Sequence, residues 1–355
     1  MAQIEVEDGN ADLRSHVSNI EEGARILTIF YPLSTIDRLL PRYDGLTCGA
    51  IAPKEFVKTS WHSLKVTLAH IDAQLKKEQG LLALAEKLFQ NTAKPLRPPG
   101  SASMLEYARM VNGQDVRWET IGVLLATLGL CIMPATSRDA EILKSHSSPT
   151  RQSMCKRLIQ ATNSCLKFCD GSGSINDPVL WILGCNLILL TQFYGDSSGY
   201  APSCSLSLAD LNIQGYVTWK RLGDISSAVF AMGLHQEIVV TSEIPRWLAE
   251  MRKQLMNFAY TLDINLSLFV GRPPRISSRY CSLDLPFALD NDQLALPSSK
   301  LESAIEHLKE VDWTSKDTIP HAGMARITLP ITMQREEILE LFLGPARNNT
   351  QQIAT

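Results

Sequence analysis

Four ionisable side chains in the second half of the chain could form an acid–base set: Asp224, His235, Glu250 and Asp263. An imidazole and a carboxylate within hydrogen-bond reach of a substrate can move protons during catalysis. Nothing in the spacing of these four residues requires that role. The chain also has no G-x-S-x-G elbow, no phosphate-binding P-loop and no H-E-x-x-H metal motif. We therefore predict that the chain is not an enzyme.

Eight cysteines offer a second kind of chemistry, as metal ligands or nucleophiles. Only Cys165 and Cys169 lie close together, on one face of a predicted helix. A structural zinc site needs two further ligands at short spacing, so we expect these cysteines to lie in the core. The scattered cysteines do not suit a disulfide scaffold, and the acidic start lacks a signal-peptide pattern. Both features predict a reducing, intracellular compartment.

Three arginines lie within ten residues, at Arg272, Arg275 and Arg279. Such a cluster could contact phosphate or the acidic segment of a partner. A solvated or ion-paired loop is the alternative interpretation. The whole chain has a net charge of −3 and a pI near 6.2, so it lacks the basic excess typical of a free-standing nucleic-acid module.

Apolar residues at steps of three and four predict the helices that position these side chains. The longest stripe covers about 25 residues and consists of Met251, Leu255, Phe258, Leu262, Leu266 and Phe269. Gly271 is placed to cap this helix, and Pro273 and Pro274 prevent its continuation. No alternating strand pattern is long enough to build a sheet. We expect an all-α fold of about ten to thirteen helices.

The predicted organisation is one large helical domain over residues 25–345, between a disordered acidic N-terminus (1–24) and a tail (346–355). One apolar stretch, residues 178–194, is barely long enough to cross a bilayer. It contains Gly184, Asn186 and Gln192, and it has no positive flank. We therefore interpret it as a helix buried on all sides.

Five short motifs follow one another over some 70 residues after Lys220. They are Gly233-Leu234-His235, Glu250 with Arg252, Tyr260 with Asp263, Gly271-Arg272-Pro273 with Ile276, and Leu285-Pro286 with Asp290 and Asp292. This order resembles the fungal-specific transcription factor domain, the middle homology region of binuclear zinc-cluster regulators. The resemblance extends over about residues 25–345 and is most specific in these five motifs.

The resemblance carries one departure. Members of the family carry an N-terminal cluster of six cysteines, in two C-x2-C-x6-C halves, which binds two zinc ions and places a helix in the DNA major groove. No such cysteine spacing occurs here, so we expect no cofactor in this chain and no reading of DNA by that route. A truncated gene model, a natural relative without the cluster and a deliberate fragment all remain open as explanations.

The resemblance implies a nuclear, transcription-regulatory module, in secondary metabolism or a nutrient pathway. Its implied partners are other transcription regulators or co-regulators, and it would reach DNA only through them or through a missing domain. A small-molecule effector and a dimer are compatible with this role, and no membrane partner is expected. A helical small-molecule-binding enzyme and a cytosolic scaffold are the alternatives.

The simplest interpretation of the signature residues is structural. His235 lies at a predicted helix end, where the helix dipole favours a positive charge. Glu250 and Arg252 lie in the first turns of the long helix. Asp263 flanks the apolar stripe, and a buried carboxylate needs a partner, for which Arg272 is our expectation.

Overall fold

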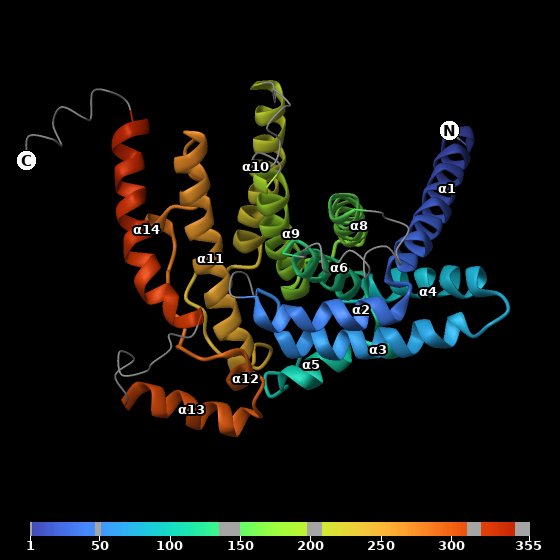
Figure 1. The fold of residues 1–355 in the computed structure, drawn as a ribbon, viewed down its shortest axis with the longest axis horizontal. Helices are drawn as coiled ribbons and strands as arrows, with labels where there is room; N and C mark the ends of the chain where they lie inside the picture. Colours follow the sequence, from blue (N-terminus) through green and yellow to red (C-terminus); the bar gives the residue numbers. More distant parts are fainter. Residues whose placement is uncertain (1, 47–50, 135–149, 197–207, 311–320, 345–355) are drawn as a thin grey trace, which may run out of the picture. The chain divides into compact units, whose positions relative to one another are not determined.

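A computed structural model of the chain describes residues 2–46, 51–134, 150–196, 208–310 and 321–344. Within these ranges there are thirteen α-helices and no strand (Figure 1). The predicted all-α fold with about ten to thirteen helices is thus confirmed. Contacts group the chain into two compact units. The expected extent of the family domain, 25–345, stays a prediction, because compact units do not mark the limits of a homologous domain.

Unit 1 comprises Met1–Leu46, Phe56–Leu96 and Ala108–Ile182. Its helices are α1 (Ala2–Leu27), α2 (Leu33–Leu39), α3 (Lys54–Asp72), α4 (Lys77–Thr92), α6 (Trp118–Ile132) and α8 (Arg151–Gly171). Every residue of α6 is buried, and α2, α4 and α8 pack against it. This follows from the sequence of α6, because a helix that is apolar all round must be covered on all sides.

The N-terminal segment differs from our expectation, since α1 occupies residues for which disorder was predicted. From His16 onward its side chains contact other helices. The His16 ring lies edge-on to Phe89 of α4, and the Glu22 carboxylate accepts a hydrogen bond from Ser164 of α8. Ala24 and Leu27 are buried. These contacts hold the part of the segment from His16 onward against α4 and α8. The predicted tail, 346–355, lies outside the described residues.

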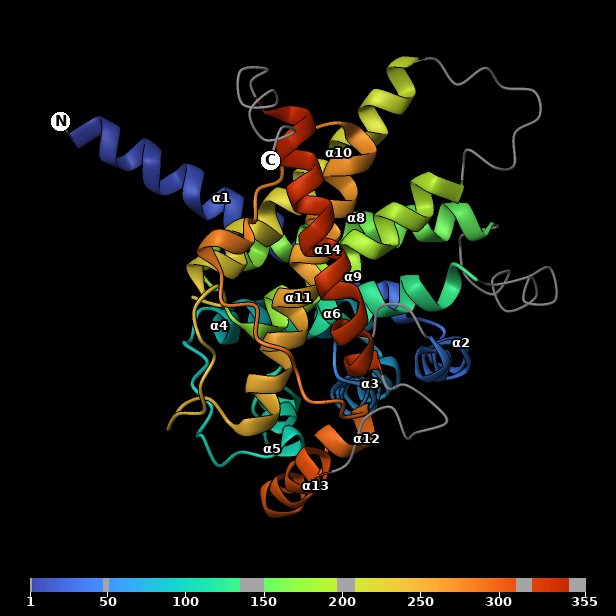
Figure 2. The same cartoon turned by 90° about the vertical axis from the view of Figure 1, so that its left-hand side faces the viewer.

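Unit 2 comprises Thr47–Glu55, Arg97–Tyr107 and Leu183–Thr355. Its helices are α10 (Leu208–Ala231), α11 (Arg246–Val270), α12 (Asn291–Leu294), α13 (Ser298–Glu310) and α14 (His321–Leu343). Helix α11 packs against α10, α13 and α14, and Figure 2 shows α14 beside it. The division between the units falls within α5 (Met104–Met110), within α9 (Asp177–Asp196) and after the first two residues of α3.

Helix α9 contains the apolar stretch discussed above. Residues 177–194 are long and apolar enough to cross a membrane by length and composition, but 72% of this window is buried. The prediction of a buried core helix is confirmed. The helix is capped by Asn176, whose side-chain oxygen accepts a hydrogen bond from the Val179 N–H at 3.2 Å. The capping residue therefore lies directly before the first helical residue, Asp177.

The apolar stripe predicted for α11 is buried at Met251 and Leu255 but not along the rest of its length. Phe269 is 88% exposed, and Phe258, Leu262 and Leu266 are only half-buried. The buried face includes Leu255, Met256, Ala259, Tyr260, Asp263, Ile264 and Ser267. Asp263 can be buried there because the segment that follows α11 supplies its hydrogen-bond donors, and Tyr260 because α14 supplies its acceptor.

Candidate functional site

Two glycines of the signature end helices in the left-handed conformation. Gly233 has φ +70°, and the N–H groups of Gly233 and Leu234 donate to the carbonyls of Phe230 and Val229. This is a Schellman cap, and its accompanying apolar residue, Leu234, is buried. Gly271 has φ +63° and ends α11, which confirms the predicted cap. A side chain at either position would be strained, because L-residues rarely adopt positive φ.

Asp263 anchors the turn that follows α11. Its side chain is fully buried, and its Oδ2 atom accepts hydrogen bonds from the backbone N–H groups of Arg275 (2.6 Å) and Ile276 (2.7 Å). The expected Arg272 partner was therefore wrong: the turn bends so that its amides, rather than that guanidinium, reach the carboxylate. Burial raises the pKa of Asp263 to about 6, although the two N–H donors and the charge of Arg275 act to lower it.

Tyr260 lies one turn before Asp263 on the same buried face. Its hydroxyl donates to Glu336 of α14 at 2.7 Å, and the same carboxylate accepts from the Ser278 N–H. Burial, followed by the bond to Glu336, raises the pKa of Tyr260 well above its ordinary value. Burial acts to raise the pKa of Glu336, but the hydrogen bonds outweigh it and lower that pKa. Three segments thus meet at one ionised carboxylate.

Two further side chains of α11 hold the chain farther along. The Asn257 amide donates to the carbonyl of Asp284 at 2.8 Å. Glu250 is fully buried, accepts the Phe287 N–H at 2.8 Å and pairs with Lys253 at 3.2 Å. Segment 275–287 therefore runs back along α11, with side chains of one helical face as its hydrogen-bond partners. We name this arrangement the α11 side-chain ladder.

The four residues considered as an acid–base set each have a different partner. Asp224 pairs with Arg221 at 2.9 Å on α10. The His235 ring lies edge-on to Phe230, and the backbone carbonyl of His235 accepts a hydrogen bond from the Ser282 N–H at 2.8 Å. Glu250 and Asp263 belong to the ladder described above. The structure therefore does not assemble these residues into one proton-transfer site.

The three arginines of the turn have separate surroundings. Arg275 lies over the Trp219 ring at 3.7 Å from its centroid, and Arg272 at 5.5 Å from the same ring. Arg279 forms an ion pair with Glu340. Among the remaining signature residues, Pro273 is exposed and Arg252 is half-buried. Only one of the three arginines, Arg275, lines a cavity.

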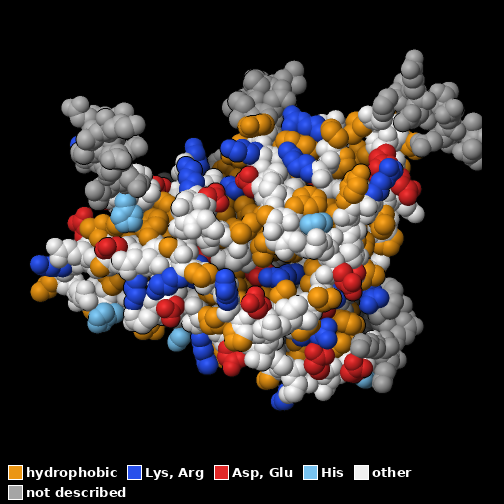
Figure 3. Space-filling view, turned by 180° about the vertical axis from the view of Figure 1, so that it is seen from behind, with side chains coloured by type: hydrophobic (Ala, Val, Ile, Leu, Met, Phe, Trp, Pro, Cys, Tyr) orange, Lys and Arg blue, Asp and Glu red, His pale blue; other side chains and the backbone are white. Residues whose placement is uncertain are grey.

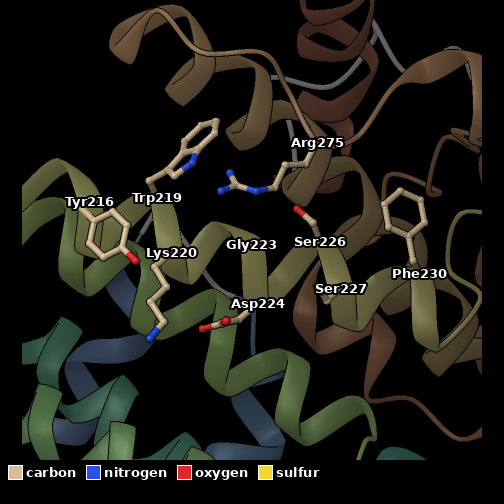
Figure 4. A pocket seen from close by; sticks show the side chains of 9 residues that line it. All are labelled: Tyr216, Trp219, Lys220, Gly223, Asp224, Ser226, Ser227, Phe230 and Arg275. Atoms are coloured by element: carbon tan, nitrogen blue, oxygen red, sulfur yellow. The ribbon is translucent and has the colours of Figure 1, made fainter.

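This cavity, which we name the α10 pocket, has a volume of about 550 Å³ (Figure 4). It is lined by Tyr216, Trp219, Lys220, Gly223, Asp224, Ser226, Ser227, Phe230 and Arg275. Eight of these residues come from one face of α10, whereas the Arg275 side chain reaches toward Trp219 from the segment after α11 (Figure 4). The pocket therefore combines aromatic rings, hydroxyls and two cations.

Sequence reasoning missed most of the α10 pocket and named only Asp224 and Arg275. A signal was present, because Tyr216, Trp219, Gly223 and Ser226 recur at helical spacing. This face is neither apolar enough for a core nor charged enough for a solvated surface. Gly223 lies against Arg275, since a Cβ there would stand 3.4 Å from its Nε atom, in ordinary van der Waals contact.

Of the cysteines that the structure describes, all but the half-buried Cys281 are buried, as predicted for Cys165 and Cys169. Burial raises the pKa of the Cys155 thiol to about 12 and places the pKa values of Cys165 and Cys169 well above the ordinary range. Neutral buried thiols are poor nucleophiles and poor metal ligands. Within the described ranges no group of three His, Cys, Asp or Glu side chains is arranged to hold a metal ion.

A second buried ionic network, absent from our sequence predictions, lies in unit 1. The Arg117 guanidinium contacts Glu119 at 2.9 Å and donates to the carbonyls of Asn91, Thr92 and Lys94 at 2.8–2.9 Å. Both side chains are almost completely buried, at 5% and 1% exposure. The guanidinium thus ties the end of α4 to the start of α6.

Glu119 has hydrogen-bond donors besides the guanidinium. Its carboxylate accepts from Ser174 at 2.7 Å, Asn176 at 2.8 Å and Thr92 at 3.1 Å. Burial acts to raise the pKa of Glu119, but Arg117 and the other donors outweigh it and lower the pKa below its usual range. The network contains no cavity and is best understood as a structural joint.

Comparison with known proteins adds no assignment: no family model, no curated protein and no solved structure matches this chain.

Proposed function

We propose that the chain is a regulatory module of a transcription regulator of the fungal zinc-cluster type, which reaches DNA through a partner protein. The observation that carries this proposal is the α11 side-chain ladder. The motifs on which the family resemblance rests, among them Glu250, Tyr260 and Asp263, act together in it. A sequence pattern whose members share one structural task is better support for a family than five separate matches.

Charge supports indirect rather than direct contact with DNA. The net charge is −3, and on the face drawn in Figure 3 the Lys and Arg side chains are interspersed with Asp and Glu. Direct binding to the phosphate backbone needs clustered positive charge. The α10 pocket supplies a candidate effector site within unit 2, as this role requires. The proposal assigns no catalytic step to the chain.

The test is chromatin occupancy of the tagged full chain in its host, with binding of naked DNA by the purified protein measured alongside. We expect occupancy at a limited set of promoters and no binding in vitro. Asp263→Leu removes the acceptor of two backbone N–H groups and should abolish occupancy, whereas Asp263→Asn keeps an acceptor and should retain it. Absence of the wild-type chain from every promoter would overturn the proposal.

A further inference from the structure

We propose that the α10 pocket binds a small aromatic carboxylate. This inference rests on the proposed function only in naming the ligand as the effector of the regulatory module. The binding itself follows from the charge, the walls and the geometry of the pocket.

The charge of the pocket favours an anion. Its one carboxylate, Asp224, is already paired with Arg221 at 2.9 Å. Among the described residues no carboxylate forms an ion pair with Arg275, although the charges of Asp263 and Asp224 act on its guanidinium. Lys220, which is exposed, adds a second positive charge to the lining.

The walls of the pocket favour an aromatic body over a bare inorganic anion. Tyr216, Trp219 and Phe230 present three rings along one face of α10 (Figure 4). Aromatic rings pack edge-to-face or offset against one another, with a gain beyond the area that they bury. A volume of about 550 Å³ lies within the usual range for small organic ligands and far exceeds what a phosphate ion needs.

The geometry of Arg275 favours a planar acceptor. Its guanidinium is stacked on the Trp219 ring at 3.7 Å, and its backbone N–H is tied to Asp263 at 2.6 Å. The guanidinium and the backbone N–H of Arg275 are therefore both held in place before a ligand binds. A fixed guanidinium presents parallel N–H groups, which suit the two oxygens of a carboxylate. The hydroxyls of Ser226 and Ser227 lie on the same lining.

The experiment is calorimetric titration of the full chain with benzoate, 2-naphthoate and indole-3-acetate, each against its uncharged amide, and with inorganic phosphate. We expect saturable binding of at least one acid, with its amide and phosphate bound at least about tenfold more weakly. If no acid binds saturably, if each amide binds as tightly as its acid, or if phosphate binds as tightly as the best acid, the proposal is wrong.

Variants locate the site. Arg275→Gln should weaken binding of the acid by at least about tenfold, whereas Arg279→Gln, in the same loop but paired with Glu340, should leave it unchanged. Equal effects of the two variants would overturn the assignment. Should Arg275→Gln fail to fold by circular dichroism, Lys220→Gln decides, because its exposed side chain is dispensable for folding. We expect it to weaken binding several-fold, and no change would count against the site.

The outcomes separate this inference from the proposed function. The titration uses purified protein and does not depend on chromatin. Binding of an acid by a chain that occupies no promoter would leave the pocket assignment intact and remove the regulatory role. Occupancy of promoters by a chain that binds no acid would leave the regulatory role intact and remove the pocket assignment.

Discussion

Glu119 and Asp263 are both fully buried carboxylates, one in each unit, and their environments differ. Glu119 contacts a guanidinium and three further side-chain donors. Asp263 has two backbone N–H groups and no ion pair among the described residues. The pKa of Glu119 is accordingly lowered, and the pKa of Asp263 is raised to about 6. Two backbone donors on one oxygen, with the Oδ1 atom left unpartnered, thus do not compensate for the burial of Asp263, whereas a contacting guanidinium with three further donors does so for Glu119.

Removing the guanidinium tests the Glu119 side of this comparison and should have the largest effect. Arg117→Met leaves a buried carboxylate without its cation, and three backbone carbonyls without their donor. We expect the free energy of unfolding to fall by about 4 kcal/mol in urea denaturation. Arg38→Met, at an exposed site on α2, is the control and should change it by less than about 0.5 kcal/mol. Similar effects of both variants would contradict the structural role.

Matched amide substitutions sharpen the comparison. Glu119→Gln leaves Arg117 buried without a counter-charge and should destabilise the protein by about 3 kcal/mol at pH 7. Asp263→Asn keeps an oxygen for the two N–H groups and should change stability by no more than about 1 kcal/mol. Urea denaturation at pH 7 compares the two. Equal losses would show that the two carboxylates are held in the same way.

The pH dependence of stability should distinguish the carboxylates by sign. Because the folded pKa of Asp263 is about 6 against an ordinary 3.8, the folded state holds this proton more tightly than the unfolded state. The stabilisation that this proton gives the folded state is complete below about pH 4 and is lost as pH rises to about 6. Over this window, wild type should lose roughly 2–3 kcal/mol relative to Asp263→Asn. A difference that stays constant from pH 4 to 7 would contradict the raised pKa.

Glu119 and Glu336 should behave in the opposite way. Their folded pKa values are lowered, so their contributions are present above about pH 4.5 and disappear as pH falls through the folded values. Below this pH the wild-type protein should therefore lose stability steeply. The Glu119→Gln variant should show a smaller loss in the same acid titration.

The smallest expected effect concerns the link between α11 and α14. Tyr260→Phe removes one hydrogen bond to Glu336 but leaves the Ser278 N–H in place. We expect a loss of about 1 kcal/mol in urea denaturation. Because the remaining donor still favours the charged form, the acid sensitivity assigned to Glu336 should persist. A loss above about 3 kcal/mol would mean that this hydroxyl, and not the N–H, holds the carboxylate.

The sequence predicted fold class and helix ends better than it predicted which faces are buried. Gly271 could be placed as a cap because a glycine followed by Pro273 and Pro274 has few other uses after a long helix. The apolar stripe containing Phe269 was predicted to be buried and is partly exposed. Periodicity counts apolar residues and cannot weigh a polar residue whose partner lies on a distant segment. The same limit hid Glu336, which is 76 residues from Tyr260.

The candidate site was only partly predictable for a related reason. Arg275 was named from a cluster of three arginines, but nothing in the sequence separated it from Arg279. Its position over Trp219 depends on where the turn after α11 returns to α10. Likewise, Arg117 and Glu119 flank the first residue of the most apolar helix, and this contrast is a sequence signal that could have indicated a buried pair.

The α11 side-chain ladder has a consequence for how the chain can change in length. Residues 275, 276, 284 and 287 of this segment are bound by α11 side chains, 278 by Glu336 of α14, and 282 by the His235 carbonyl. Inserting one residue at 277 would shift every later attachment point relative to a partner that cannot follow. The interval 279–281 holds none of these attachment points, so an added residue there can bulge outward. Length variation in this segment should therefore be confined to that short interval.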